Sequence, residues 1–278
     1  RVLAERPPFT GNDITLTIDI ELQQQIQTCA KDETASLCLM DITTGEILVL
    51  LSTPGFDPNV FVTPSRGEER MMLLEDRSLP FLNRAISSRY PPGSIFKIVT
   101  ALAALEAGKI TPQTQLECTG SYQLTPNSRS FKCWAQFGHG QVALEKALQQ
   151  SCNVYFYKVA RMLGAEGLAR FAKKIELGDP VRIELPHVAR GLIPSPLWKK
   201  ENLHEQWYQG ETLHYAIGQG YLAVTPLQML RLVSIIANEG KIIEPTIISG
   251  VQHPVKKYAL KKANIRAVKS CMLKAVNT

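Results

Sequence analysis

Several features that often decide a protein's class are missing from this sequence. It contains no run of about 18 to 20 consecutive apolar residues, so it predicts no membrane-spanning helix. Its six cysteines are too few and too unevenly spread over 278 residues to indicate a disulfide scaffold. It shows no internal repeat and no low-complexity tract. It begins at Arg1 without a signal-peptide pattern, which we interpret as a segment of a longer protein.

The composition is that of an ordinary globular protein. Apolar residues make up 45% of the chain and charged residues 20%, which leaves no case for disorder over most of the length. The length favours one large domain with a small N-terminal appendage. The net charge is +6, but the basic side chains are scattered apart from one small cluster. We interpret that cluster, Lys256, Lys257, Lys261 and Lys262, as solvated surface, and we expect no nucleic-acid partner.

The first quarter of the chain predicts a strand, a helix and a hairpin. Apolar and polar residues alternate from Asn12 to Asp19, which is the period of a strand with one buried face. Asp19 is a plausible N-cap for a helix over Glu21–Ala30. Two runs rich in β-formers, Ala35–Ile42 and Glu46–Ser52, are joined by a short glycine-containing turn and predict the hairpin.

The rest of the chain predicts mainly helices. Residues 94–107 are apolar almost all round and end before Gly108, which indicates a buried central helix. Residues 111–140 are polar and read as a long loop. Further helices are expected over residues 142–150, 153–163 and 225–236, and a strand over residues 242–248.

Ser94 and Lys97 form the first candidate for chemistry. Three residues apart on a helix, they share one face, where a lysine with a lowered pKa can activate a serine for acyl transfer. Alone, Ser-x-x-Lys is a weak signal that recurs by chance. Here Ser94 follows Pro-Pro-Gly, and Lys97 lies in an apolar helix, where burying a charged side chain costs free energy and therefore suggests a function. The amide of Ser94, at a helix N-terminus, is a natural half of an oxyanion hole.

Three further segments accompany this pair in the same order as in a known family. They are Gln150–Tyr157 with its Ser-x-Asn element, Gly218–Tyr221, and Thr225–Met229. Together with Arg89–Lys97 and the opening strand Leu16–Asp19, they resemble the motifs of class B penicillin-binding proteins, notably the elongation-specific penicillin-binding protein 2. The resemblance covers nearly the whole chain.

The resemblance implies a fold and an activity. The fold is a mixed α/β transpeptidase fold like that of penicillin-binding proteins and serine β-lactamases, with an antiparallel sheet flanked by helices. The activity is that of a peptidoglycan D,D-transpeptidase, a serine-type D-Ala-D-Ala transpeptidase/carboxypeptidase that acts in cell elongation and shape and is acylated by β-lactams. A serine β-lactamase, or a non-catalytic β-lactam sensor or scaffold, is the alternative.

The resemblance also implies residue roles. Ser94 attacks the carbonyl of a D-Ala-D-Ala stem peptide and Lys97 accepts its proton. Ser151 passes a proton to the leaving D-alanine, and Asn153 holds the substrate amide and orients Lys97. Taken without the family, Ser151 and Asn153 are equally well explained as helix N-caps. Ser94, Ser151 and Asn153 would also contact substrate, and catalysis needs no cofactor.

The chain departs from the family in one motif. It contains no Lys-Thr-Gly or Lys-Ser-Gly triplet, and Lys269-Ser270-Cys271 is not an adequate substitute. We therefore expect residues 13–278 to be a transpeptidase domain that stops just before its third motif, and residues 1–12 to be the end of an N-terminal pedestal. The missing residues would bind the substrate carboxylate, so this segment by itself is expected to be impaired or inactive.

A second candidate site consists of Cys118, Cys133, His139 and Cys152. Three thiolates and one imidazole are a common ligand set for structural zinc, and a metal would organise the long polar loop. A Cys118–Cys133 disulfide and unconnected buried cysteines remain alternatives. Some members of the elongation-specific branch carry zinc beside the active site, so the resemblance favours the metal.

The resemblance further implies a location and partners. The whole protein would be anchored in the bacterial inner membrane by an N-terminal segment, with this domain in the periplasm. Stem peptides and β-lactams would bind it, and a glycan polymerase and elongation-complex proteins would be its partners. We expect no site role for the remaining histidines or for three aromatic residues, namely His187, His204, His214, His253, Trp207, Tyr208 and Tyr221.

Overall fold

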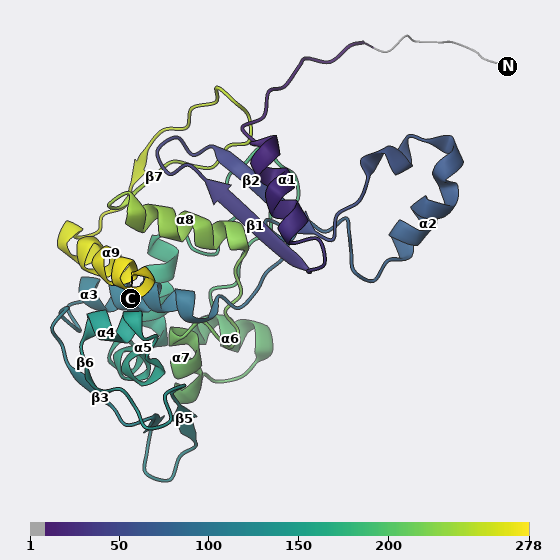
Figure 1. Cartoon of the computed structure of the whole chain (residues 1–278). Helices are drawn as coiled ribbons and strands as arrows, with labels where there is room; N and C mark the ends of the chain where they lie inside the picture. The colour runs from purple at the N-terminus through teal and green to yellow at the C-terminus, as the bar shows by residue number, and fades with distance from the viewer. Residues whose placement is uncertain (1–8, 278) are drawn as a thin grey trace.

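Helices dominate the computed structural model, which describes residues 9–277, and the strands form short antiparallel pairs (Figure 1). Residues 1–8 of the expected pedestal, residues 1–12, lie outside the described residues. The α-helices in the described part are α1 (Ile20–Cys29), α2 (Gly67–Glu75), α3 (Lys97–Glu106), α4 (Leu144–Gln149), α5 (Asn153–Lys174), α6 (Pro196–Leu203), α7 (Gln209–Ala216), α8 (Pro226–Ala237) and α9 (Lys262–Val276). The paired strands are β1 (Ala35–Met40) with β2 (Ile47–Thr53), β3 (Leu116–Cys118) with β6 (Gly140–Val142), β4 (Ser121–Gln123) with β5 (Ser130–Lys132), and β7 (Lys241–Ile242) with β8 (Lys256–Lys257). This arrangement confirms the expected mixed α/β fold.

The predicted hairpin and the helix before it are confirmed. The β1–β2 pair runs from Ala35 opposite Thr53 to Met40 opposite Ile47, with a shift of register between Leu39 and Met40, and alternate residues of β2 are buried. Asp19 caps α1, because its side chain accepts a hydrogen bond of 3.0 Å from the Leu22 amide. Helix α1 packs on β2 and α8 packs on β1, so helices flank the hairpin.

Two predicted strands are wrong as regular strands. Residues 12–19 are extended but make a single bridge, between Leu16 and Ile248, and Ile14 and Leu16 remain 66% and 50% exposed. In the predicted strand over residues 242–248, β7 ends at Ile242. Each of these segments pairs with another segment only at isolated residues, whereas a regular strand needs a neighbouring strand along its whole length. Alternation of apolar and polar residues cannot show whether such a neighbouring strand exists.

The central helix is confirmed and forms the core of the larger helical group. A 3₁₀ turn over Gly93–Phe96 leads directly into α3, whose residues from Lys97 to Leu105 are all buried. Helices α5 and α9 pack against α3. The helix predicted over residues 153–163 is the first part of α5; Gly164 is non-helical, with a φ of 70°, and a second helical run continues beyond it to Lys174. None of the helices within residues 9–277 has the length and apolar character needed to cross a membrane.

The polar region over residues 111–140 is not the structureless loop that its composition predicts. It contains β3, β4 and β5, and β3 pairs with β6 so that Cys118 lies opposite Gly140. Four helices of the described residues, α2, α6, α7 and α9, were not predicted from the sequence pattern. The Lys269–Cys271 triplet lies within α9 and not on a strand, which agrees with its rejection as a third motif.

Substitution of Leu102, which lies in α3 and is 1% exposed, tests how strongly the stability of the core depends on this helix. We expect Leu102→Ala to lower the free energy of unfolding by about 2 to 5 kcal/mol, because the lost side chain leaves a cavity in a packed core. Leu273→Ala in α9 is the matched control, since Leu273 is 63% exposed and its loss should change the free energy by less than about 0.5 kcal/mol. Urea unfolding followed by circular dichroism measures both. Equal midpoints for the two variants would contradict the central role of α3.

Candidate active site and metal cluster

The turn before α3 presents Ser94 to solvent. Tyr90 and Val224 exchange backbone hydrogen bonds of 2.8 and 2.9 Å, and the Gly93 amide donates to the Gly218 carbonyl at 2.9 Å. Gly93 itself has a φ of 57°, a conformation that favours glycine. The chain is therefore held at both ends of the turn, and Ser94 follows it in an exposed position at the start of the helical run.

Lys97 lies one turn further along and is only 1% exposed. Its Nζ donates to Ser151 Oγ at 2.9 Å, to the Ser151 carbonyl at 2.8 Å and to Asn153 Oδ1 at 2.6 Å. These three bonds use all three donors of an ammonium group. The Asn153 side chain also donates from Nδ2 to the Lys132 carbonyl at 3.4 Å, which fixes its orientation.

Ser151 connects Lys97 to Ser94. Its Oγ donates to Ser94 Oγ at 3.0 Å and accepts from Lys97, so the hydrogen bonds run from Ser94 through Ser151 to Lys97. Ser151 has a left-handed backbone, with a φ of 50°, just before α5 begins. The structure thus brings the four predicted residues together. The sequence placed Lys97 beside Ser94 and did not show that Ser151 lies between their polar atoms.

The environment of Lys97 makes its ammonium group easier to deprotonate. Burial lowers its pKa to about 8, and the thiols of Cys133 and Cys152 oppose part of this effect. A lysine with this pKa is a free amine in a usable fraction of molecules near neutral pH, as a general base must be. The lowered pKa and the hydrogen bonds to Ser151 are what the activation of a serine by a lysine requires.

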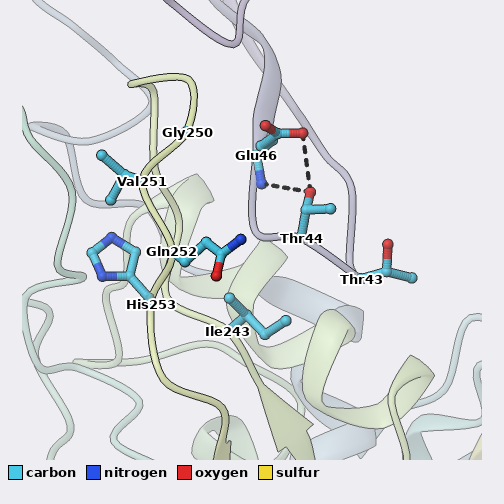
Figure 2. A pocket seen from close by; sticks show the side chains of 8 residues that line it. All are labelled: Thr43, Thr44, Glu46, Ile243, Gly250, Val251, Gln252 and His253. Carbon is cyan, nitrogen blue, oxygen red and sulfur yellow. Dashed lines mark hydrogen bonds between the residues drawn. The ribbon is translucent and has the colours of Figure 1, made fainter.

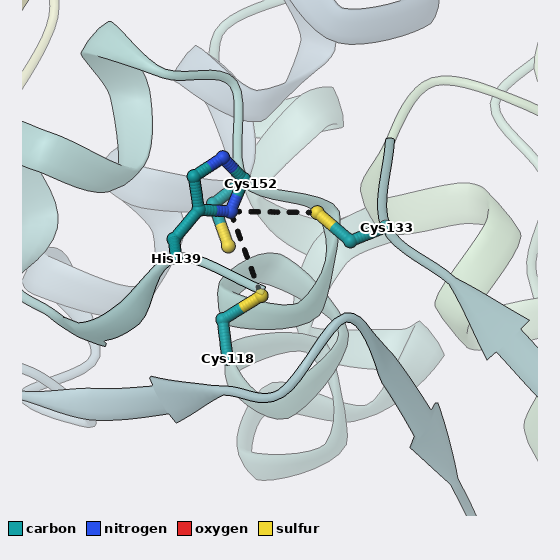
Figure 3. Close-up of side chains that lie close together, drawn as sticks. All are labelled: Cys118, Cys133, His139 and Cys152. Atoms are coloured by element: carbon teal, nitrogen blue, oxygen red, sulfur yellow. Dashed lines mark hydrogen bonds between the residues drawn. The ribbon is translucent and has the colours of Figure 1, made fainter. Parts of the chain in front are cut away.

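The second candidate site is also assembled. The ligand atoms of Cys118, Cys133, His139 and Cys152 all lie within 4.8 Å of one another (Figure 3). His139 Nδ1 is 3.5 Å from Cys118 Sγ and 3.6 Å from Cys133 Sγ. The cluster joins β3, the ends of β5 and β6, and the N-terminus of α5. The six cysteines are all free, so the alternative of a Cys118–Cys133 disulfide is not borne out.

The protein environment changes the acidity of the cluster residues in different directions. Burial raises the pKa of the Cys133 thiol, but hydrogen bonds from backbone amides outweigh it and leave this pKa lowered. Burial raises the pKa of Cys152 to about 12. Burial, with Lys146 and Lys97 nearby, lowers the pKa of His139 and favours the neutral imidazole that a metal requires.

A pocket of about 430 Å³ opens beside Asn153. Its walls also include the side of β5 and the end of α7, so it offers both cationic and aromatic groups. The lining residues are Arg129, Ser130, Phe131, Lys132, Asn153, Tyr157, His214, Ile217 and Gln219. The sequence did not predict this pocket or a place for His214 in it. No local pattern shows that β5 and the end of α7 lie next to the Ser-x-Asn element.

Other set-aside residues lie away from the candidate site. His187 and His204 are exposed, each with a left-handed backbone, and His253 is 3.3 Å from a Glu184 oxygen. His253 lines a different pocket of about 310 Å³ near the β1–β2 turn, shown in Figure 2, where Thr44 hydrogen-bonds Glu46. That pocket contains none of the predicted site residues.

Known proteins resemble the chain over most of its length. Residues 35–278 match the family described as penicillin binding protein transpeptidase domain. The peptidoglycan D,D-transpeptidase MrdA of Escherichia coli is 37% identical over 248 residues, which are 89% of this chain and 39% of that protein. MrdA of Acinetobacter baumannii is 33% identical over 263 residues, 95% of this chain and 39% of that protein.

Solved structures agree with the sequence matches. PBP2 of Pseudomonas aeruginosa, in complex with WCK 5153, superposes with a TM-score of 0.87 at 34% identity, covering 95% of this chain and 60% of that one. PBP2 of Helicobacter pylori gives a TM-score of 0.89 at 30% identity, covering 96% and 51%. The chain spans about two fifths of the length of the curated relatives named here. Through these matches and the motifs described above, the chain belongs to the penicillin-binding protein transpeptidase domain family.

Proposed function

We propose that this chain carries the catalytic serine of a peptidoglycan D,D-transpeptidase that acts in cell elongation and shape and is acylated by β-lactams. The observation that carries the proposal is the hydrogen-bond chain from Ser94 through Ser151 to Lys97, with Asn153 completing the contacts of the amine. The relatives named above are transpeptidases and penicillin-binding proteins, which favours this activity over a β-lactamase or a sensor.

The site performs acyl transfer in two steps. Ser94 Oγ forms a bond to the carbonyl carbon of the penultimate D-alanine, the peptide bond to the terminal D-alanine breaks, and the proton of the hydroxyl ends on the leaving amine. Lys97 receives this proton from Ser94, and Ser151 hands a proton on to the leaving amine. Ser151 Oγ is placed for this transfer, because it lies within hydrogen-bonding distance of Lys97 Nζ and of Ser94 Oγ. The amine of a second stem peptide then attacks the acyl-enzyme and restores Ser94.

Asn153 has two roles in this scheme. Its Oδ1 holds the Lys97 amine at 2.6 Å, and it also lines the pocket beside the site, where it can meet the substrate amide. Ser94, Ser151 and Asn153 are therefore the residues that contact substrate. The backbone amide of Ser94, at the start of the helical run, supplies one donor to the developing oxyanion.

Zinc fits the cysteine and histidine cluster. Bond lengths of about 2.3 Å to sulfur and 2.0 Å to nitrogen at a tetrahedral angle separate the two ligand atoms by about 3.5 Å, close to the observed 3.5 and 3.6 Å. Cys118, Cys133, His139 and Cys152 would hold the ion, and His139 would bind through Nδ1. The metal would cross-link the loops and hold α5, and it would take no part in acyl transfer.

We infer the setting of the whole protein from that of its relatives. One solved structure is a complex of PBP2 with MreC from Helicobacter pylori, and another is a peptidoglycan synthase complex that coordinates polymerization and crosslinking. By analogy, this protein works in the periplasm, attached to the inner membrane, with a glycan polymerase and elongation proteins. Its transpeptidase domain begins near residue 13, because Thr17 already bonds to the Ile47 and Ile247 carbonyls.

Mass spectrometry after incubation with benzylpenicillin tests the proposed activity. The full-length protein is the sample, since these 278 residues contain no Lys-Thr-Gly or Lys-Ser-Gly triplet to bind the ligand carboxylate. We expect a long-lived adduct of one benzylpenicillin on the parent and none on Ser94→Ala, which removes the nucleophile. Rapid loss of the adduct would instead indicate a β-lactamase, and no adduct on the parent would contradict the proposal.

The pH dependence of acylation tests Lys97 as the base. We expect the rate constant for benzylpenicillin to rise with pH around a midpoint near pH 8, because deprotonation of Lys97 supplies the free amine. Cys133 and Cys152 are the titratable groups that oppose the shift. Lys97→Met should react about 10² to 10⁴ times more slowly and lose this step. A rate that stays constant between pH 6 and 9 in the parent would exclude Lys97 as the titrating base.

Metal content tests the zinc proposal. We expect the purified protein to contain about one zinc per chain, and Cys133→Ser and His139→Ala to lower both this ratio and the melting temperature, since each removes one of four ligands. Cys29→Ser is the control, because Cys29 is exposed and outside the cluster. Elemental analysis by mass spectrometry gives the ratio. A ratio that Cys133→Ser and His139→Ala leave unchanged would place the metal elsewhere.

A further inference from the structure

A second buried lysine, Lys199 in α6, takes no part in the chemistry described above. It is 1% exposed, and its Nζ lies 2.5 Å from a Glu211 oxygen and 3.1 Å from a Glu205 oxygen. Glu211 also accepts a hydrogen bond of 2.8 Å from the Tyr208 amide at the N-terminus of α7. Lys199 thus ties α6 to the start of α7.

Two aromatic rings complete the surroundings of this ammonium group. Nζ lies 4.9 Å from the centre of the Tyr208 ring and 5.5 Å from that of Tyr221, within the range of cation–π attraction. The ring of Trp198, one residue before Lys199, also packs against Tyr221, with 5.4 Å between the ring centres. Tyr221 is therefore held by two consecutive residues of α6.

The two buried lysines differ in their partners and therefore in their charge. The carboxylates of Glu211 and Glu205 outweigh the effect of burial and raise the pKa of Lys199 above its ordinary value, so that it stays protonated. Burial without a carboxylate lowers the pKa of Lys97 to about 8. Lys199 is thus a fixed positive charge and is unsuited to accept a proton.

Tyr221 belongs to the segment on which the Ser94 turn rests. Three residues before it, Gly218 accepts the hydrogen bond of the Gly93 amide, and a Cβ at position 218 would overlap the Gly93 carbonyl. Three residues after it, Val224 exchanges hydrogen bonds with Tyr90. Tyr221 lies midway between the two points that fix the turn in front of the nucleophile.

We propose that Lys199 is a positioning residue for Ser94 and acts through Tyr221. Its charge holds the Tyr221 ring against α6, and the segment over residues 218–224 in turn holds both ends of the turn that presents Ser94. This inference rests on the proposed function, because it assumes that Ser94 is the group that is acylated. Nucleophilic attack depends steeply on placement, and a displacement of about 1 Å can cost about 100-fold in rate.

The test compares Lys199→Met, Tyr221→Leu and the double variant in the full-length protein. We expect each single variant to lower the maximal rate constant for acylation by a fluorescent penicillin about 10- to 100-fold. We expect the double variant to be no slower than the slower single variant, because both changes break the same contact. Tyr221→Leu leaves the Lys199 carboxylate pairs intact, so it reports on the contact without leaving a buried charge unpaired. Tyr221→Phe keeps the ring and should react like the parent.

Rates are measured well below each melting temperature, with circular dichroism to establish that the variants are folded. If Lys199 is merely structural, Lys199→Met lowers the melting temperature while the folded protein is acylated at the parental rate, and the proposal is overturned. The proposal is also overturned if Tyr221→Leu is acylated at the parental rate. It is overturned as well if the rate losses of the two single variants multiply in the double variant. A parent that shows no Ser94 adduct at all would instead refute the proposed function.

Discussion

The active site depends on burying one amine among oxygen atoms that carry no formal charge. Lys97 donates to two oxygens of Ser151 and to one of Asn153, and the hydrogen bonds described within residues 9–277 include none from it to a carboxylate. A carboxylate would hold the proton on the amine, whereas here burial outweighs the opposing effect of Cys133 and Cys152 and lowers the pKa of Lys97 to about 8. In the proposed mechanism, the buried first turn of α3 thus lets Lys97 activate a weak nucleophile such as Ser94 near neutral pH.

This arrangement requires segments that are far apart in the sequence. The Ser94 turn is held by Gly218 and Val224, while the partners of Lys97 come from the start of α5. Because α3 packs against α5, and α5 packs against α7, the same hydrophobic core fixes all three segments relative to one another. The chemistry is therefore a product of the core packing, and changes remote from Ser94 can reach it through backbone contacts.

Local signals in the sequence predicted part of the structure well. The helix after Pro-Pro-Gly, the Asp19 cap and the hairpin each depend on neighbouring residues, and the structure contains all three. The strands over residues 12–19 and 242–248 were wrong because pairing depends on distant partners. The family motifs named four residues that the structure brings together, but the place of Ser151 between Ser94 and Lys97 depends on a left-handed backbone, with a φ of 50°. The burial of Lys199 could not be predicted, because no local feature of the sequence distinguishes this lysine from the other 30 lysines and arginines.

The N-terminus of α5 joins the cysteine and histidine cluster to the proposed catalytic residues. Cys152 is fully buried and its Sγ accepts a hydrogen bond of 3.4 Å from the Tyr155 amide, so one thiol both caps α5 and belongs to the cluster. Its two neighbours, Ser151 and Asn153, are only half-buried and turn toward Lys97. Consecutive residues thus serve the cluster and the catalytic group from the same short stretch of backbone. A ligand that fixes Cys152 also fixes the two side chains that orient the amine, and it does so without contact to the reacting atoms.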